Sequence, residues 1–347
     1  MMTEKERLAS ALKGRAVDRQ PCICPGGMMN MITRELMEKV ETLWPQAHSD
    51  AGLMAGLAAA SYDQGCFENY GLPFCMTTEV EAMGAGVDLG TIDREPHVIQ
   101  YVMESVEEWP KLPPLDFERG RVKVALDAIS LLRDRKSGVP IIGNLTGPVS
   151  VASSLMEPTT FYKQLRRKKG PAKEFMNFVT VQLIQFGLKQ MEAGADFIAI
   201  SDPSASGEIL GPNLFDEYAR PALTMIIEGL KKEFPETAVI VHICGKMHTV
   251  FHSLSQVPAE AVSFDAVVSL TKARKNFPGR AIMGNVSTFA LELSTPEKVA
   301  ALTRHCLKRA DIISPACGMG TGSPLINVQS ILATIKRQSV EKAAGSQ

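Results

Sequence analysis

Short apolar segments alternate with longer amphipathic stretches along most of the chain. The clearest apolar segments are 139–144, 195–201 and 238–243, which are rich in isoleucine and valine. Such continuous apolar runs are typical of strands that are buried on both faces of a parallel sheet. Between them, residues 171–193 and 213–233 carry apolar side chains at helical spacing. The pattern therefore predicts strands joined by helices, the order of an α/β protein.

Eight candidate strands can be placed along the chain, at residues 21–25, 62–67, 139–144, 195–201, 238–243, 261–265, 280–284 and 310–315. Eight strands alternating with helices favour a closed (β/α)8 TIM barrel over an open sheet. We expect residues 1–339 to form this barrel as a single domain, with a short N-terminal helix. Residues 68–115 are expected to form an excursion of loops and a helix after the second strand. Residues 340–347 are expected to fray as a C-terminal tail.

Local signals define the ends of several helices. Thr3 and Glu6 have the spacing of a capping box, and Gly14 is placed to stop the helix that follows. Pro212 is placed to start the helix at 213–233. Pro221 should kink that helix, because proline has no backbone N–H and its ring clashes with the preceding turn.

Composition narrows the range of function classes. The 347 residues are 45% apolar and carry a net charge of −1, so a large core is expected and no general basic field is available to attract nucleic acid. No window approaches 18 uninterrupted apolar residues, and no membrane span is expected. The odd count of seven cysteines and the lack of a recognisable signal peptide argue against a disulfide framework and favour the cytoplasm. The basic run at 166–169 is interpreted as a solvated helix face, with a docking patch for an acidic protein as the alternative.

One imidazole and two thiols carry the main candidate chemistry. His242 and Cys244 end the fifth predicted strand, where residues two apart point to the same side. Cys317 follows the eighth strand in a glycine-rich loop, and strand ends of a barrel meet at its mouth. One nitrogen and two sulfur ligands suit zinc, and three protein ligands leave a tetrahedral position open, as in catalytic sites. The alternative interpretation is a small buried cysteine beside a hydrogen-bonded histidine.

Other polar residues also follow predicted strands and are candidates to line a substrate pocket. They are Asn144 and Thr146 after the third strand, Asp202, Ser204 and Ser206 after the fourth, and Asn285 and Ser287 after the seventh. Cys22 and Cys24 are interpreted as core residues, with pocket lining as the alternative. His248 and His252 are four apart on a predicted helix, where they are expected to face a groove or solvent.

The chain resembles a known family through several short motifs. These motifs are residues 44–50 (WPQAHSD), 81–84 (EAMG), 143–148 (GNLTGP), 194–196 (GAD), 242–245 (HICG), 284–286 (GNV) and 317–318 (CG). Together they resemble the uroporphyrinogen decarboxylase superfamily, and within it the branch of methylcobamide:coenzyme M methyltransferases. The resemblance extends from about residue 3 to about residue 335.

The resemblance implies a (β/α)8 barrel with zinc bound by His242, Cys244 and Cys317. It implies transfer of a methyl group from a methyl-Co(III) corrinoid to a small thiol such as coenzyme M, by attack of a zinc-activated thiolate. The corrinoid would arrive on its own protein, which would dock transiently at the barrel mouth, with residues 68–115 as a plausible rim. Decarboxylation fits poorly, because residues 25–31 (PGGMMNM) contain no arginine to grip substrate carboxylates, and residues 66–69 (CFEN) do not supply the family's catalytic aspartate.

Two alternatives to this function remain open. Another acceptor such as homocysteine could take the methyl group, since cobalamin-independent methionine synthases use a similar zinc site with an added glutamate. Asp265 is the nearest carboxylate by position. The chain could instead be a non-catalytic corrinoid- or tetrapyrrole-binding protein with a structural zinc. His48 lies in the branch-specific motif, and the sequence assigns it no role.

Overall fold

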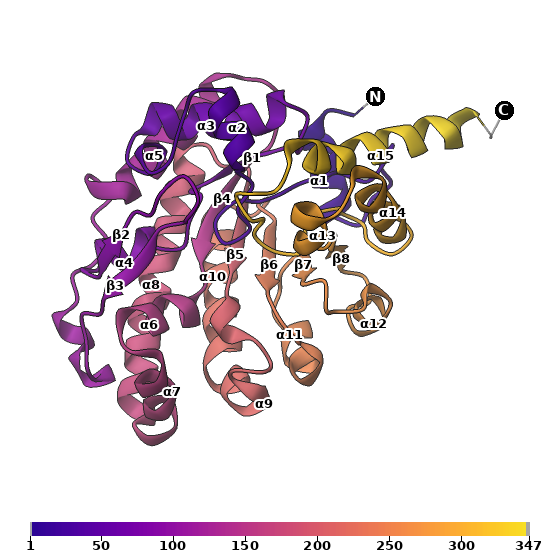
Figure 1. Cartoon of the computed structure of the whole chain (residues 1–347). Coiled ribbons are helices and arrows are strands. Elements are labelled where there is room, and N and C mark those ends of the chain that lie inside the picture. Colours follow the sequence, from indigo (N-terminus) through magenta and orange to yellow (C-terminus); the bar gives the residue numbers. More distant parts are fainter. Residues whose placement is uncertain (1, 345–347) are drawn as a thin grey trace.

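A ring of parallel strands forms the centre of the chain, and helices surround it (Figure 1). The computed structural model describes residues 2–344. Six strands pair in parallel in the order β1-β4-β5-β6-β7-β8. Two short extended segments complete the ring, since Ile312 bridges to Met283 of β8 and Ile313 bridges to Cys22. The N–H of Glu68, just before β1, then donates to the carbonyl of Cys22 at 2.7 Å. The predicted (β/α)8 barrel is confirmed.

The strands of the sheet and of a separate antiparallel hairpin are β1 (Tyr70–Leu72), β2 (Gly86–Asp88), β3 (His97–Gln100), β4 (Ile141–Thr146), β5 (Phe197–Ser201), β6 (Val239–Ile243), β7 (Ala261–Phe264) and β8 (Ala281–Met283). The helices are α1 (Glu4–Leu12), α2 (Arg34–Lys39), α3 (Ala51–Asp63), α4 (Thr78–Ala82), α5 (Gly120–Asp134), α6 (Pro148–Leu155), α7 (Pro158–Arg167), α8 (Lys169–Ala193), α9 (Gly211–Leu214), α10 (Arg220–Glu233), α11 (Phe251–Ser255), α12 (Leu270–Asn276), α13 (Thr288–Leu293), α14 (Pro296–Leu307) and α15 (Leu325–Ala344).

The second strand is the one strand prediction that was wrong. Residues 62–67 belong to the end of α3 and the turn after it, and the strand lies at Tyr70–Leu72. Two polar residues, Glu68 and Asn69, precede this strand and are buried. Their polarity interrupts the apolar run that a buried strand normally shows, and the prediction therefore fell on the neighbouring segment 62–67.

Polar side chains close the ring where backbone pairing is sparse. The amide oxygen of Asn69 accepts a hydrogen bond from the N–H of Cys24 at 2.9 Å, and its amide nitrogen donates to the carbonyl of Cys24 at 2.8 Å. One carboxylate oxygen of Glu68 accepts from the N–H of Cys22 at 3.0 Å and from Arg19 at 2.7 Å. These side chains satisfy backbone groups of the extended segment at residues 22–24, which would otherwise be buried without partners.

The predicted helix ends are largely confirmed. Thr3 and Glu6 form a reciprocal capping box at the start of α1, and α8 ends at Gly194, whose φ is 121°. The helix expected at 213–233 is divided into α9, a π-helical turn at Phe215–Ala219 and α10. The wide turn ends two residues before Pro221, which has no N–H to continue the regular hydrogen-bond ladder.

The excursion after β1 contains α4, the β2–β3 hairpin and a 3-10 turn at Val106–Lys111; the hairpin lies at the left edge of Figure 1. The turn of this hairpin contacts the loop that follows Cys317. The carbonyl of Asp93 in the turn accepts a hydrogen bond from the hydroxyl of Thr321 at 3.2 Å. Asp93 also forms an ion pair with Arg34. At the other end of the chain, α15 continues to Ala344, so the described part of the tail expected at 340–347 is helical, and residues 345–347 lie outside the described residues.

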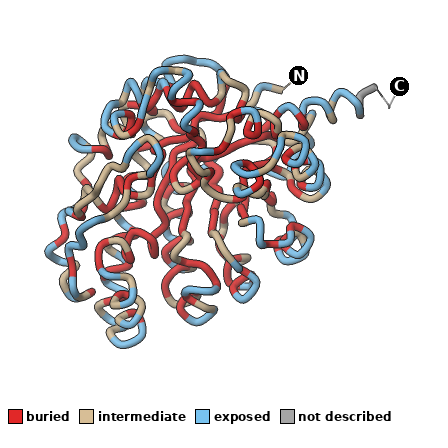
Figure 2. Tube along the Cα trace, viewed as in Figure 1, coloured by how far each residue is buried: buried red, intermediate tan, exposed pale blue. Residues whose placement is uncertain are grey.

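Burial is concentrated in the strands and on the inner faces of the helices (Figure 2). Every residue of β4, β5, β6, β7 and β8 is buried, as the continuous apolar runs predict for a sheet covered on both sides. Within residues 2–344, no helix combines the length and apolar character needed to cross a membrane.

Candidate metal centre

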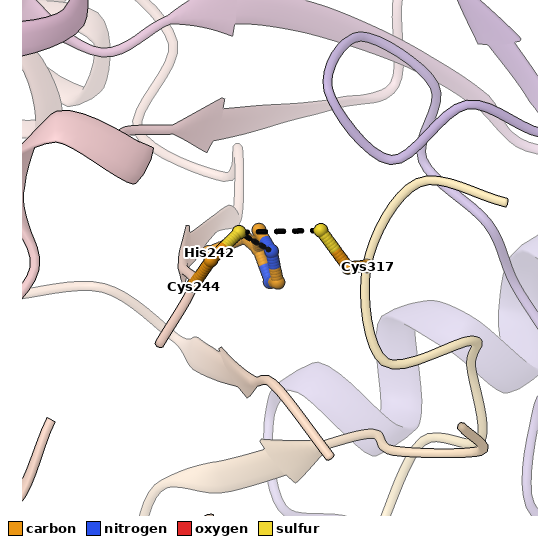
Figure 3. Close-up of side chains that lie close together, drawn as sticks. All are labelled: His242, Cys244 and Cys317. Atoms are coloured by element: carbon orange, nitrogen blue, oxygen red, sulfur yellow. Dashed lines mark hydrogen bonds between the residues drawn. The ribbon is translucent and has the colours of Figure 1, made fainter. Parts of the chain in front are cut away.

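Three side chains converge beyond the ends of two strands. His242 is the penultimate residue of β6, Cys244 follows that strand, and Cys317 lies in the loop after the bridged segment at 312–313. The Nε2 atom of His242 lies 3.1 Å from Sγ of Cys244, and the two sulfur atoms lie 3.2 Å apart (Figure 3). All three potential ligand atoms lie within 4.8 Å of one another. The structure therefore brings together the three side chains that the sequence analysis selected.

Two glycines allow this approach. Gly245 has a φ of 76°, a left-handed conformation that lets the chain turn away directly after Cys244. Gly318 follows Cys317, and a Cβ atom at this position would lie 2.4 Å from the carbonyl oxygen of Met28. Any larger residue would force the Cys317 loop away from the segment around Met28.

Ser263 orients the imidazole. It faces His242 in the parallel register of β6 and β7, and its Oγ lies 2.9 Å from Nδ1 of His242. This contact occupies Nδ1 and leaves Nε2 directed at the thiols. Metal-binding histidines commonly use their second nitrogen in this way, which fixes the tautomer. Ser263 was not among the predicted site residues, because its contact with His242 depends on the register of β6 against β7.

The two thiols share a proton unequally. The hydrogen bond from Cys244 lowers the pKa of Cys317 to about 5 against the effect of burial, and His242 acts in the same direction. The same hydrogen bond, together with burial, raises the pKa of Cys244 above its ordinary value. One thiolate is therefore favoured, and a second is opposed by repulsion that a divalent cation would remove. An imidazole and two thiols that can ionise in this way fit a zinc ion.

The proposed pocket residues make contacts within the protein. Asn144 is buried, and its amide nitrogen donates to the carbonyls of Pro25 at 2.6 Å and Leu72 at 3.2 Å. The amide nitrogen of Asn285 donates to the carbonyls of Asp265 at 2.9 Å and Val268 at 3.0 Å. Asn285 lies after β8, as predicted, whereas Asn144 lies within β4, which extends two residues further than predicted. Direct contact with a substrate stays a prediction for each.

Asp202 connects the end of β5 to the start of α6. Its side chain is fully buried and accepts hydrogen bonds from the N–H groups of Val149 at 3.1 Å and Ser150 at 2.8 Å, and from the Ser150 hydroxyl at 2.6 Å. Burial raises the pKa of Asp202 to about 6. The hydroxyl of Ser204 lies 3.1 Å from that of Ser153 on α6. Asp202 thus acts as an acceptor for the α6 N-terminus, and a substrate contact stays a prediction for both residues.

The remaining cysteine and histidine candidates are separate from the metal centre. All seven cysteines are unpaired thiols. Cys22 and Cys24 are fully buried, burial raises the pKa of both, and the thiol of Cys24 donates to the carbonyl of Met29 at 3.1 Å. These contacts support the interpretation of core packing. His248 and His252 are exposed, as expected.

Cys75 is a buried thiol beside a charged side chain, and it was not among the predicted site residues. Arg121 donates to Sγ of Cys75 at 3.1 Å and to the hydroxyl of Thr77 at 2.8 Å. Burial opposes ionisation of Cys75, yet the charges of Arg121 and His48 lower its pKa to about 5. Burial, with smaller effects from Cys75 and Cys317, raises the pKa of Glu95 to about 8. No local sequence pattern indicates this cluster, because its members come from four separate segments of the chain.

Fold and site together define a (β/α)8-barrel protein whose strand ends present one imidazole and two thiols. The chain belongs to the uroporphyrinogen decarboxylase (URO-D) family, which it matches over residues 3–338. It is 32% identical to methylcobamide:CoM methyltransferase MtaA of Methanosarcina barkeri over 95% of this chain and 97% of that protein. Methylcobamide:CoM methyltransferase MtbA of Methanosarcina acetivorans is also 32% identical, over 96% of this chain and 98% of its own length.

A solved structure gives the same result. The structure described as a methyltransferase from Methanosarcina mazei superposes with a TM-score of 0.90 at 30% sequence identity, covering 97% of this chain and 99% of that chain. By these relations the chain is an enzyme of the methyltransferase type.

Proposed function

We propose that this enzyme uses zinc to transfer a methyl group from a protein-bound methyl-Co(III) corrinoid to a small thiol such as coenzyme M. The convergence of His242, Cys244 and Cys317 carries the proposal. The names of the relatives support it, since MtaA and MtbA are methylcobamide:CoM methyltransferases.

The chemical need is for a thiolate in a partly buried site. A free thiol has a pKa of about 8.5, so only a small fraction is present as the nucleophilic thiolate at neutral pH. Zinc held by His242, Cys244 and Cys317 would stabilise the substrate as its thiolate. Two protein thiolates balance the charge of the ion, so electron density stays on the incoming sulfur.

The reaction is a displacement at carbon. The substrate sulfur forms a bond to the methyl carbon as the carbon–cobalt bond breaks, and the bonding pair stays with cobalt, which changes from Co(III) to Co(I). The products are a methyl thioether and the reduced corrinoid. In this scheme the chain orients the sulfur toward the barrel mouth, and Ser263 keeps the imidazole of His242 in place.

A corrinoid is bulky, so its carrier protein must approach the mouth of the barrel. The turn of the β2–β3 hairpin lies beside the Cys317 loop, through the contacts of Asp93 with Thr321 and Arg34. We propose that this turn forms part of the rim on which the corrinoid protein docks transiently.

Removal of either thiol tests the proposal. In Cys244→Ala or Cys317→Ala, we expect the loss of about one equivalent of zinc and of methyl transfer from methylcobalamin to a panel of thiols that includes coenzyme M and homocysteine. The barrel should still fold, as circular dichroism would show. Cys66→Ala serves as the control, because Cys66 is a buried thiol in the turn after α3 and is not part of the candidate centre. Full activity in metal-free protein would refute the proposal.

A further inference from the structure

A thioether lies against the candidate metal centre. The Sδ atom of Met28 is 3.5 Å from Sγ of Cys244, and Met28 is partly buried. Two sulfur ligands at about 2.3 Å from a tetrahedral zinc ion lie about 3.8 Å from each other. The separation of Met28 and Cys244 is therefore close to that of two neighbouring ligands on one ion.

The backbone holds Met28 in this place. Residues 26–29 form a tight turn in which the N–H of Met29 donates to the carbonyl of Gly26 at 3.0 Å. Gly26 and Gly27 both have positive φ, at 96° and 60°. The N–H of Gly27 donates to the carbonyl of Pro73 at 2.8 Å, which ties the turn to the end of β1. Substitution of either glycine would strain the conformation that presents Met28.

The same segment is attached to the loop that carries Cys317. The N–H of Met319 donates to the carbonyl of Asn30 at 3.1 Å, and the side-chain amide of Asn30 donates to the carbonyl of Met319 at 3.2 Å. The carbonyl of Met28 lies directly against Gly318. The two hydrogen bonds between Asn30 and Met319 therefore hold the Met28 segment and the Cys317 loop in fixed relation.

We propose that Met28 supplies the fourth, exchangeable ligand of the zinc ion before the thiol substrate binds. The inference rests on the zinc centre of the proposed function. A thioether is neutral, so the ion, two thiolates, the imidazole and Met28 together carry no net charge, which suits a partly buried site. A thioether is also a soft but weak ligand. An anionic substrate thiolate can therefore displace it, with the thiol proton leaving to solvent.

The proposal has a consequence for product release. The side chain of Met28 ends in CH3–S–CH2, which is the functional group of a methylated thiol. The product is thus no better a ligand than Met28, while Met28 is covalently attached and present at high effective concentration. Return of Met28 to its place would favour departure of the product.

Selenium labelling tests the proposal directly. Protein prepared with selenomethionine and one equivalent of zinc is measured by X-ray absorption at the zinc edge. We expect one nitrogen, two sulfur atoms and one selenium atom around zinc. Met28→Leu should remove only the selenium contribution, while Met29→Leu, a change at the neighbouring methionine, should retain it. Addition of coenzyme M should replace selenium by a third sulfur atom.

The outcomes separate the two proposals. Zinc bound by two sulfur atoms and one nitrogen, with oxygen or nitrogen in place of selenium, would refute the role of Met28 and leave the proposed function intact. Zinc without the set of two sulfur atoms and one nitrogen would refute the metal centre itself.

Discussion

The hydroxyl of Ser263 lies on the strand next to His242, with its Oγ 2.9 Å from Nδ1 of the imidazole. Ser263→Ala removes this partner and leaves the ring free to change tautomer or orientation. We expect the affinity for zinc to fall by about 10- to 100-fold, the usual effect of removing such a partner. Competition with a chromophoric chelator measures this change.

Ser263→Thr retains a hydroxyl at the same place and serves as the matched control. Its zinc affinity should stay much closer to that of the wild type. Equal affinities in Ser263→Ala and the wild type would show that the imidazole is held by packing alone.

The three side chains of the candidate metal centre could be selected from sequence because each lies at or directly after a predicted strand end. His242 and Cys244 are two residues apart in a strand, and Cys317 lies in a glycine-rich loop after another strand. Ser263 and Met28 could not be predicted, because their contacts depend on strand register and on a turn 216 residues away from Cys244. Position at a strand end identifies where a side chain lies but not which partner it takes.

A buried carboxylate, that of Asp202, accepts hydrogen bonds at the N-terminus of helix α6. Asp202 accepts hydrogen bonds from the N–H groups of Val149 and Ser150 in the first turn, and burial raises its pKa from 3.8 to about 6. The folded state therefore binds a proton more tightly at Asp202 than the unfolded state does. The contribution of this linkage to stability is complete below about pH 4 and is lost as the pH rises through about 6.

Asp202→Asn removes the titration. We expect the free energy of unfolding of the wild type, relative to this variant, to decline by an amount on the order of 2–3 kcal/mol between pH 4 and pH 7. Urea unfolding of both proteins across this range measures the difference. Parallel pH profiles for the two proteins would contradict a titrating Asp202.

The strands differ in how well the sequence predicts them, and the reason is physical. β4, β5 and β6 are continuous apolar runs, and the predicted segments match them within two residues. β1 spans only three residues and follows Glu68 and Asn69, whose burial depends on partners elsewhere in the chain. A polar residue that is buried by distant partners has no signature in local sequence.

Zinc binding should stabilise the folded barrel, and the barrel should also fold without zinc. The core is apolar and includes residues of every strand of the barrel sheet, whereas the candidate metal centre lies at the carboxyl end of β6. Free zinc at about 100 times its Kd should raise the free energy of unfolding by about 2.7 kcal/mol, which corresponds to an increase of several degrees in Tm. Thermal unfolding with zinc and with a chelator measures this shift.

The far-ultraviolet circular dichroism of the metal-free protein should match that of the loaded protein. A double variant, Cys244→Ala with Cys317→Ala, should show no zinc-dependent shift in Tm. A metal-free chain without helical signal would instead assign zinc a role in folding.

The order of the ligands along the chain also constrains how the enzyme matures. Cys317 is 73 residues beyond Cys244 and follows the bridged segment at 312–313. A ribosome must therefore translate every strand of the ring before the third side chain of the candidate centre exists, and until then the nascent polypeptide offers only the imidazole and one of the two thiols. In the proposed function, zinc would consequently reach its full set of ligands late in biogenesis, after synthesis of the final strand segment has allowed the ring to close.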